Sequence, residues 1–108
     1  MAMILREWRG RADYDREDAY PAHFRSRVVP ELRHVSGFLG AYLVQRDIGG
    51  AVEFTVMTKW TSMDAVRAFA GNDVNKAVVE SGAVEALSDF DEHVSHHDIL
   101  EQVASGAG

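Results

Sequence analysis

The chain has 108 residues, of which 46 % are hydrophobic and 26 % charged, and its formal net charge is −6. This length suits one domain with a single core, which we expect over residues 1–103, followed by a disordered tail, 104–108. The negative charge argues against nucleic acid or an anionic membrane as partner, because both need a basic surface. No apolar stretch reaches the roughly 20 residues of a membrane helix, and the N-terminus lacks a basic region followed by an apolar run, so we expect a cytoplasmic protein.

The first predicted element is a strand over residues 3–12. Ile4, Trp8 and Ala12 lie on one of its faces, with Arg6 between them. A buried guanidinium without a partner is costly. Arg6 therefore either pairs with a carboxylate, contacts a ligand oxygen, or reaches water along its stem.

A helix is predicted from about Pro21 to His34, because proline is tolerated in the first helical turn and disfavours helix in the residue before it. Pro30 lies inside this helix, where it removes one backbone donor and crowds the carbonyl of Ser26, so we expect a kink. The apolar stripe of the helix consists of Phe24, Val28, Leu32 and Val35.

A glycine pair, Gly49-Gly50, joins two long apolar runs and predicts a tight antiparallel hairpin. With Ile48 opposite Ala51, one face carries pairs suited to a core, namely Leu39–Trp60, Ala41–Thr58, Leu43–Val56 and Gln45–Phe54. The other face carries Tyr42–Met57, Val44–Thr55 and Arg46–Glu53. That second face is too apolar for solvent, so we expect another subunit to cover it.

Three elements are predicted after the hairpin. Ser62 can cap a helix that Gly71 ends. A shorter helical piece is expected from Asn72 or Asp73 through Val74, Val78 and Val79, with Ser81-Gly82 interrupting it. The last strand is expected from Phe90 to Leu100. This order predicts an α+β fold of the ferredoxin-like βαββαβ type, with a four-stranded antiparallel sheet.

Several segments carry a resemblance to a known family. They are residues 29–32 leading to 36–40, residues 53–60 running into 62–64, Phe69 followed by 72–74, and residues 96–99. Through them the chain resembles the antibiotic biosynthesis monooxygenase family. This resemblance implies a homodimer that forms an α+β barrel, and it implies one of two chemistries. The family includes quinone-forming oxygenases that need neither metal nor flavin, and it includes haem degraders.

The haem chemistry is not supported by the residues at the corresponding positions. Haem degraders that resemble this chain have an asparagine on the first strand, with a tryptophan and an iron-binding histidine on or near the second helix. Here those positions hold Trp8, Phe69 and Val79. We therefore expect no haem, no metal and no other cofactor.

Two histidines are the candidate catalytic residues. His23 lies beside Phe24 at the edge of the helical stripe, where it can act as a base toward a phenol or be a partly exposed helical residue. On the last strand, His93 and His97 would lie about 13 Å apart on one face and His96 on the other, which argues against a metal site. His96 aligns with a histidine that recurs in the family. Its alternative role is a structural hydrogen bond.

The candidate substrate-binding residues are Arg6, Trp8, Tyr20, Phe24, Trp60 and Phe69. The aromatic members can hold a planar ligand or simply form core. Two functions stay open. One is a cofactor-independent monooxygenase acting on a small aromatic or polyketide-like substrate, and the other is a non-enzymatic dimeric barrel that binds a small hydrophobic molecule or has a structural role. A cavity between the first helix and the sheet with at least two polar side chains would favour the enzyme.

Overall fold

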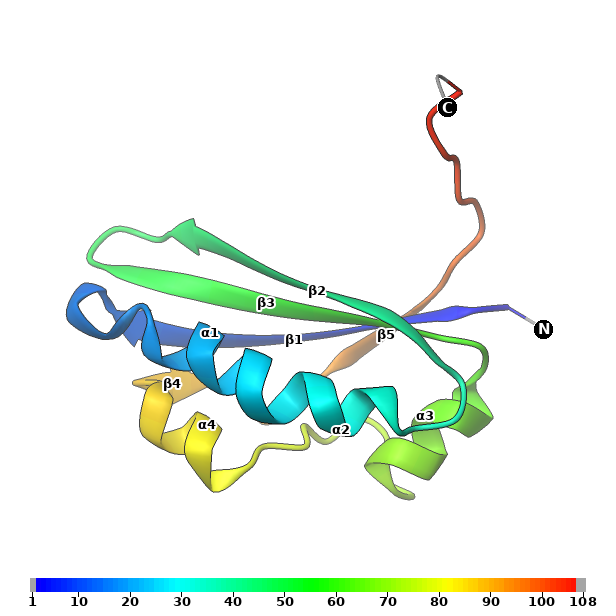
Figure 1. The fold of residues 1–108 in the computed structure, drawn as a ribbon, viewed down its shortest axis with the longest axis horizontal. Helices are drawn as coiled ribbons and strands as arrows, with labels where there is room; N and C mark the ends of the chain where they lie inside the picture. Colours follow the sequence, from blue (N-terminus) through cyan, green and yellow to red (C-terminus); the bar gives the residue numbers. More distant parts are fainter. Residues whose placement is uncertain (1, 107–108) are drawn as a thin grey trace.

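The computed structural model describes residues 2–106, in which helices cover one face of an antiparallel sheet (Figure 1). The strand order is β2-β3-β1-β4, and β5 pairs with β1 as well. This order is that of a ferredoxin-like fold, so the predicted α+β class is confirmed. The strands are β1 (Ile4–Asp13), β2 (Phe38–Asp47), β3 (Ala51–Trp60), β4 (Asp89–Phe90) and β5 (Ser95–Asp98).

The first helical layer begins two residues earlier than predicted, because Pro21 still falls within the first turn. Pro30 is preceded by a π-helical turn, in which the N–H of Val29 donates to the carbonyl of Phe24. Such turns are a known response to a disrupted hydrogen-bond ladder. The layer consists of the short 3₁₀ turn Tyr14–Arg16, α1 (Ala19–His23), the π turn Phe24–Val28 and α2 (Val29–Arg33).

The predicted hairpin register is confirmed over most of its length, with Ala41 opposite Thr58 and Leu43 opposite Val56. Gly49 and Gly50 have φ values of 80° and 100°, which glycine adopts without steric cost. The register is wrong at the start of β2. A bulge there pairs Phe38 with Trp60, and Leu39 is left 45 % exposed instead of entering the core.

Helix α3 (Met63–Ala70) follows the prediction, because Ser62 Oγ accepts a hydrogen bond from the N–H of Ala65 at 3.2 Å and Gly71 ends the helix. The shorter helical piece predicted after Gly71 is wrong. Residues 72–80 form no helix, and α4 (Ser81–Ala86) begins where a break was expected.

The predicted last strand is also wrong as a continuous element, since β4 and β5 are separated by residues 91–94. Asp91 still bonds to β1, because its N–H donates to the carbonyl of Arg9 at 2.9 Å, but Glu92 and Val94 bond to the irregular segment 72–80. The N–H of Val94 donates to the carbonyl of Asn75, and the N–H of Ala77 donates to the carbonyl of Glu92. Within the predicted tail, residues 104–106 are exposed and residues 107–108 lie outside the described part, so its disorder stays a prediction.

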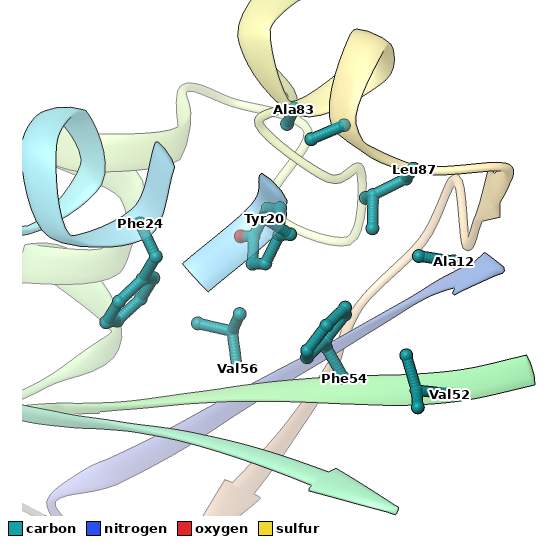
Figure 2. Packing of buried hydrophobic residues seen from close by; sticks show 9 residues of the cluster. Ala12, Tyr20, Phe24, Val52, Phe54, Val56, Ala83 and Leu87 are labelled. Atoms are coloured by element: carbon teal, nitrogen blue, oxygen red, sulfur yellow. The ribbon is translucent and has the colours of Figure 1, made fainter. Parts of the chain in front are cut away.

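Two hydrophobic clusters fill the space between sheet and helices. In the first, Phe54 and Val56 on β3 point toward Tyr20 and Phe24 on the helical layer (Figure 2). In the second, Trp60 is fully buried and donates its Nε1–H to Thr58 Oγ1 at 2.8 Å. The remaining buried members of the second cluster are Ile4, Leu32 and Val66.

Candidate functional site

A cavity of about 80 Å³ lies between the helical layer and the sheet. Its wall is mostly apolar, with aliphatic side chains from every layer and the aromatic rings of Trp8, Tyr20 and Phe69. Its polar members are Arg6, His23, Glu31, Thr58 and Glu80. An apolar wall with a few convergent polar groups is typical of small-molecule sites.

Five of the eight predicted site residues line this cavity, namely Arg6, Trp8, Tyr20, His23 and Phe69. The other three do not. Phe24 and Trp60 belong to the two core clusters, because their rings point into packed neighbours. His96 lies on the cavity side of β5, but it contacts Arg6 and is not part of the wall.

Three polar wall residues were not among the predicted site residues. Glu31 follows His23 by eight residues on the same helical layer, a spacing of about two turns that indicates a shared face. Thr58 alternates with Val56 and Trp60 on β3 and was therefore identifiable as an inward residue. Glu80 had no such signal, because the apolar spacing of its segment predicted a helix that the structure does not contain.

The aromatic part of the wall is fixed by packing and by one hydrogen bond. The ring centroids of Trp8 and Tyr20 lie 5.8 Å apart, and those of Tyr20 and Phe54 lie 5.6 Å apart. Trp8 donates its Nε1–H to the carbonyl of Asp91 at 2.7 Å. Burial raises the pKa of Tyr20, so its phenol stays protonated at neutral pH and cannot act as a base there.

His23 is the unusual polar residue of the wall. Among the described residues, its Nε2 is the buried side-chain nitrogen or oxygen without a hydrogen-bond partner. A Cβ at Gly82 would lie 2.7 Å from Nδ1 and Cε1 of this ring, so glycine is what lets α4 approach His23 so closely. Buried polar groups are normally paired, and an exception calls for an explanation such as a ligand or a catalytic role.

Two carboxylates from different elements meet beside His23. The neighbouring carboxyl of Glu80, by its hydrogen bond and its charge, raises the pKa of Glu31, while Arg27 and His23 act in the opposite direction. Glu31 lies on α2, and Glu80 directly precedes α4. The helical side of the cavity is therefore acidic.

Arg6 supplies the sheet side of the cavity with a buried cation, only 5 % exposed. Its Nη1 donates to the carbonyl of Val74 at 2.6 Å and contacts His96 Nε2 at 2.8 Å, and its Nη2 donates to the carbonyl of Lys76 at 3.2 Å. The guanidinium carbon also lies 5.9 Å from the centre of the Phe69 ring. No carboxylate of the described residues forms an ion pair with Arg6, so the alternative in which Arg6 pairs with a carboxylate of the chain is wrong.

His96 must accept the hydrogen bond from Arg6, because a guanidinium has no acceptor. Its ring proton therefore resides on Nδ1. Burial lowers the pKa of His96, and the charges of Arg6 and His97 lower it further. His97 lies on the opposite face, 3.9 Å from a carboxylate oxygen of Glu7, as strand alternation predicts. Within residues 2–106 no three side chains are grouped as a metal site would require.

These features define a ferredoxin-like α+β protein with a small cavity between sheet and helices. Residues 1–81 match the family model for antibiotic biosynthesis monooxygenase, and the chain belongs to this family, as predicted. No curated protein matches the sequence. In the described part of the chain, no helix has the length and apolar character needed to span a membrane.

Solved structures share the fold at low sequence identity. A Bacillus cereus protein assigned to the same family is 13 % identical, with 97 % of this chain and 100 % of that chain covered and a TM-score of 0.69. A cofactor-independent oxygenase from Streptomyces nogalater is 15 % identical, with 97 % and 100 % covered and a TM-score of 0.59. A monooxygenase from Streptomyces coelicolor, in complex with nanaomycin D, is 17 % identical, with 99 % and 93 % covered and a TM-score of 0.60.

The side chains of the wall do not match the haem-binding set expected from the resemblance. Trp8 and Phe69 stand where an asparagine and a tryptophan were expected, and both form part of the cavity wall.

Proposed function

We propose that this protein is a cofactor-independent monooxygenase that acts on a small phenolic or polyketide-like aromatic compound. The observation that carries the proposal is the unpaired Nε2 of His23 in a cavity wall made mostly of apolar and aromatic side chains. Family membership supports it. Leaving an imidazole nitrogen buried and unpaired costs free energy, and a hydrogen bond from a substrate hydroxyl would offset that cost.

In the proposed reaction, His23 acts as the general base. With its ring proton on Nδ1, Nε2 offers a lone pair to the phenol O–H, and imidazole is the side chain that most often serves as a general base. The resulting enolate donates an electron to dioxygen. One oxygen atom then bonds to the ring carbon, which loses its hydrogen, and the other oxygen leaves as water. Phenol and dioxygen thus give quinone and water.

The apolar wall contributes by excluding water from the reactive enolate. An apolar cavity of roughly 150 Å³ accommodates benzene. The present cavity of about 80 Å³ must therefore widen to admit a phenol. Residues 74–77 are held by hydrogen bonds to Arg6 and to residues 92 and 94, whereas the next residue, Val78, is 52 % exposed and part of the wall, so we propose that Val78 moves on binding.

The test begins with a screen of phenols for oxygen uptake. Histidine-to-glutamine variants of the protein are then assayed on any phenol that proves to be a substrate. We expect His23→Gln to lower kcat by about 10²–10⁴-fold, because a general base is lost. His96→Gln should act mainly on KM, since it acts through Arg6. His34 and His93 are exposed and serve as matched controls with little effect.

Equal activity in all four folded variants would rule out histidine as the base. Ligand binding without oxygen uptake on any phenol would favour the non-enzymatic alternative. The polar side chains in the cavity, which include Arg6, His23 and Glu80, favour the enzyme over that alternative.

A further inference from the structure

We infer that the cavity selects aromatic ligands that carry an anionic oxygen, such as a carboxylate, and that Arg6 binds this oxygen. The inference rests on the proposed function, because it assigns the substrate class of the same cavity. It follows from an imbalance of charge on the sheet side of the wall.

Arg6 is a buried cation whose partners are all neutral. Two of them are backbone carbonyls, and the third is the Nε2 of His96 in its accepting form. Buried charges in proteins are usually paired with an opposite charge, because desolvation is costly. Burial lowers the pKa of Arg6 to about 10, so the side chain is still charged at neutral pH. The anion that would balance it is therefore expected from the ligand.

The guanidinium also keeps capacity for such a ligand. It has five N–H groups, and the three hydrogen bonds to Val74, Lys76 and His96 use three of them. Two N–H groups in a fixed planar arrangement suit the two oxygens of a carboxylate. Arg6 is part of the wall, which places its side chain next to a ligand in the cavity.

The opposite side of the cavity gives the ligand an orientation. Glu31 lies on the helical layer with His23, and Glu80 directly precedes α4, whereas Arg6 projects from the sheet. A ligand carboxylate is repelled by the two glutamates and attracted by Arg6. A hydroxyl at the other end of the ring then faces His23, where deprotonation is proposed. Hydroxylated aromatic acids have both groups.

The test measures equilibrium binding of benzoate and of neutral benzamide, which has nearly the same shape, by ligand-observed NMR titration. We expect the wild-type protein to bind benzoate about tenfold to one-hundredfold more tightly, the range of a charge-assisted hydrogen bond. Arg6→Gln should remove this preference, and Arg6→Lys should keep part of it. Arg9→Gln, on the same strand but at an exposed position, is the matched control and should keep all of it.

A variant of Arg6 that does not fold would not block the test. In the wild-type protein, the Nε–H resonance of Arg6 should then shift on addition of benzoate and not of benzamide. Equal affinity for both probes, or a preference that survives in folded Arg6→Gln, overturns the inference. Because no turnover is measured, this failure is distinct from failure of the oxygenase proposal. Oxygen uptake on neutral phenols without a preference for anions would contradict this inference alone. A preference for anions without oxygen uptake would contradict the oxygenase proposal alone.

Discussion

Arg6 and His96 are linked by a hydrogen bond of 2.8 Å that exists only while His96 is neutral, because a protonated imidazole cannot accept it. Burial and the charge of Arg6 hold the pKa of His96 below its ordinary value of 6.5. As the pH falls below that value, the unfolded chain binds more protons than the folded chain, and the free energy of unfolding decreases. The stability from neutral His96 is therefore fully present above about pH 6.5 and is lost as the pH falls through the lower pKa of the folded state.

This linkage predicts that His96→Gln makes stability less dependent on pH. Glutamine still accepts a hydrogen bond from Arg6 but does not titrate. Urea unfolding at pH 7.5 and at pH 5.5 should show a smaller drop in midpoint for His96→Gln than for the wild type. His34→Gln, at an exposed position, should behave like the wild type. An unchanged drop in His96→Gln would mean that His96 is not held neutral in the folded protein.

At single positions, alternation along strands and spacing along helices predicted much of the cavity wall. Arg6 and Trp8 were placed inward by the period of two in β1, and His23 by its place beside the helical stripe. The same patterns cannot separate a cavity wall from packed core. Trp60 is aromatic and inward like Trp8, yet Phe38 and Phe69 pack on it at 5.5 Å and 5.2 Å between centroids.

At the level of elements, local chemistry predicted the hairpin and α3, because glycine loops and a serine cap act through their own neighbours. The segment 72–80 could not be predicted in that way. Val74, Val78 and Val79 have helical spacing, but the backbone there bonds to residues 92–94 far along the chain. Tertiary hydrogen bonds of this kind override a local period.

The bend into β2 depends on Gly37, whose φ is +90°. A Cβ at this position would lie 2.5 Å from Ala65 Cβ and 2.8 Å from Thr61 Oγ1, so α3 would have to move. We expect Gly37→Ala to lower the free energy of unfolding by about 1–3 kcal/mol, from backbone strain and overpacking together. Chemical denaturation measures this.

The control for Gly37 is Gly40, three residues along the same segment. A Cβ at Gly40 meets nothing within 4 Å, and its φ is not in the left-handed region. Gly40→Ala should therefore unfold close to the wild-type midpoint. If both variants lose the same stability, then the contact with α3 does not determine the requirement for glycine.

On the scale of the whole molecule, the helices leave the outer face of the sheet uncovered (Figure 1). Tyr42 is 70 % exposed there, and Val44 and Leu39 on the same strand are exposed as well. Exposed apolar side chains gathered on one strand are typical of a surface that contacts another protein. A second copy of the chain would cover this face with the same residues through a two-fold axis, as expected from the family's barrel.

We therefore predict a homodimer formed through this face. Light scattering at micromolar concentration should give about twice the chain mass of 12.0 kDa. Replacing Tyr42 with Glu and Val44 with Lys should yield a folded monomer, because burying the two charges at the interface is costly. Val84→Lys, on α4 and 48 % exposed, is the matched control and should stay dimeric. A wild-type protein that scatters as a monomer would remove both the interface and the barrel.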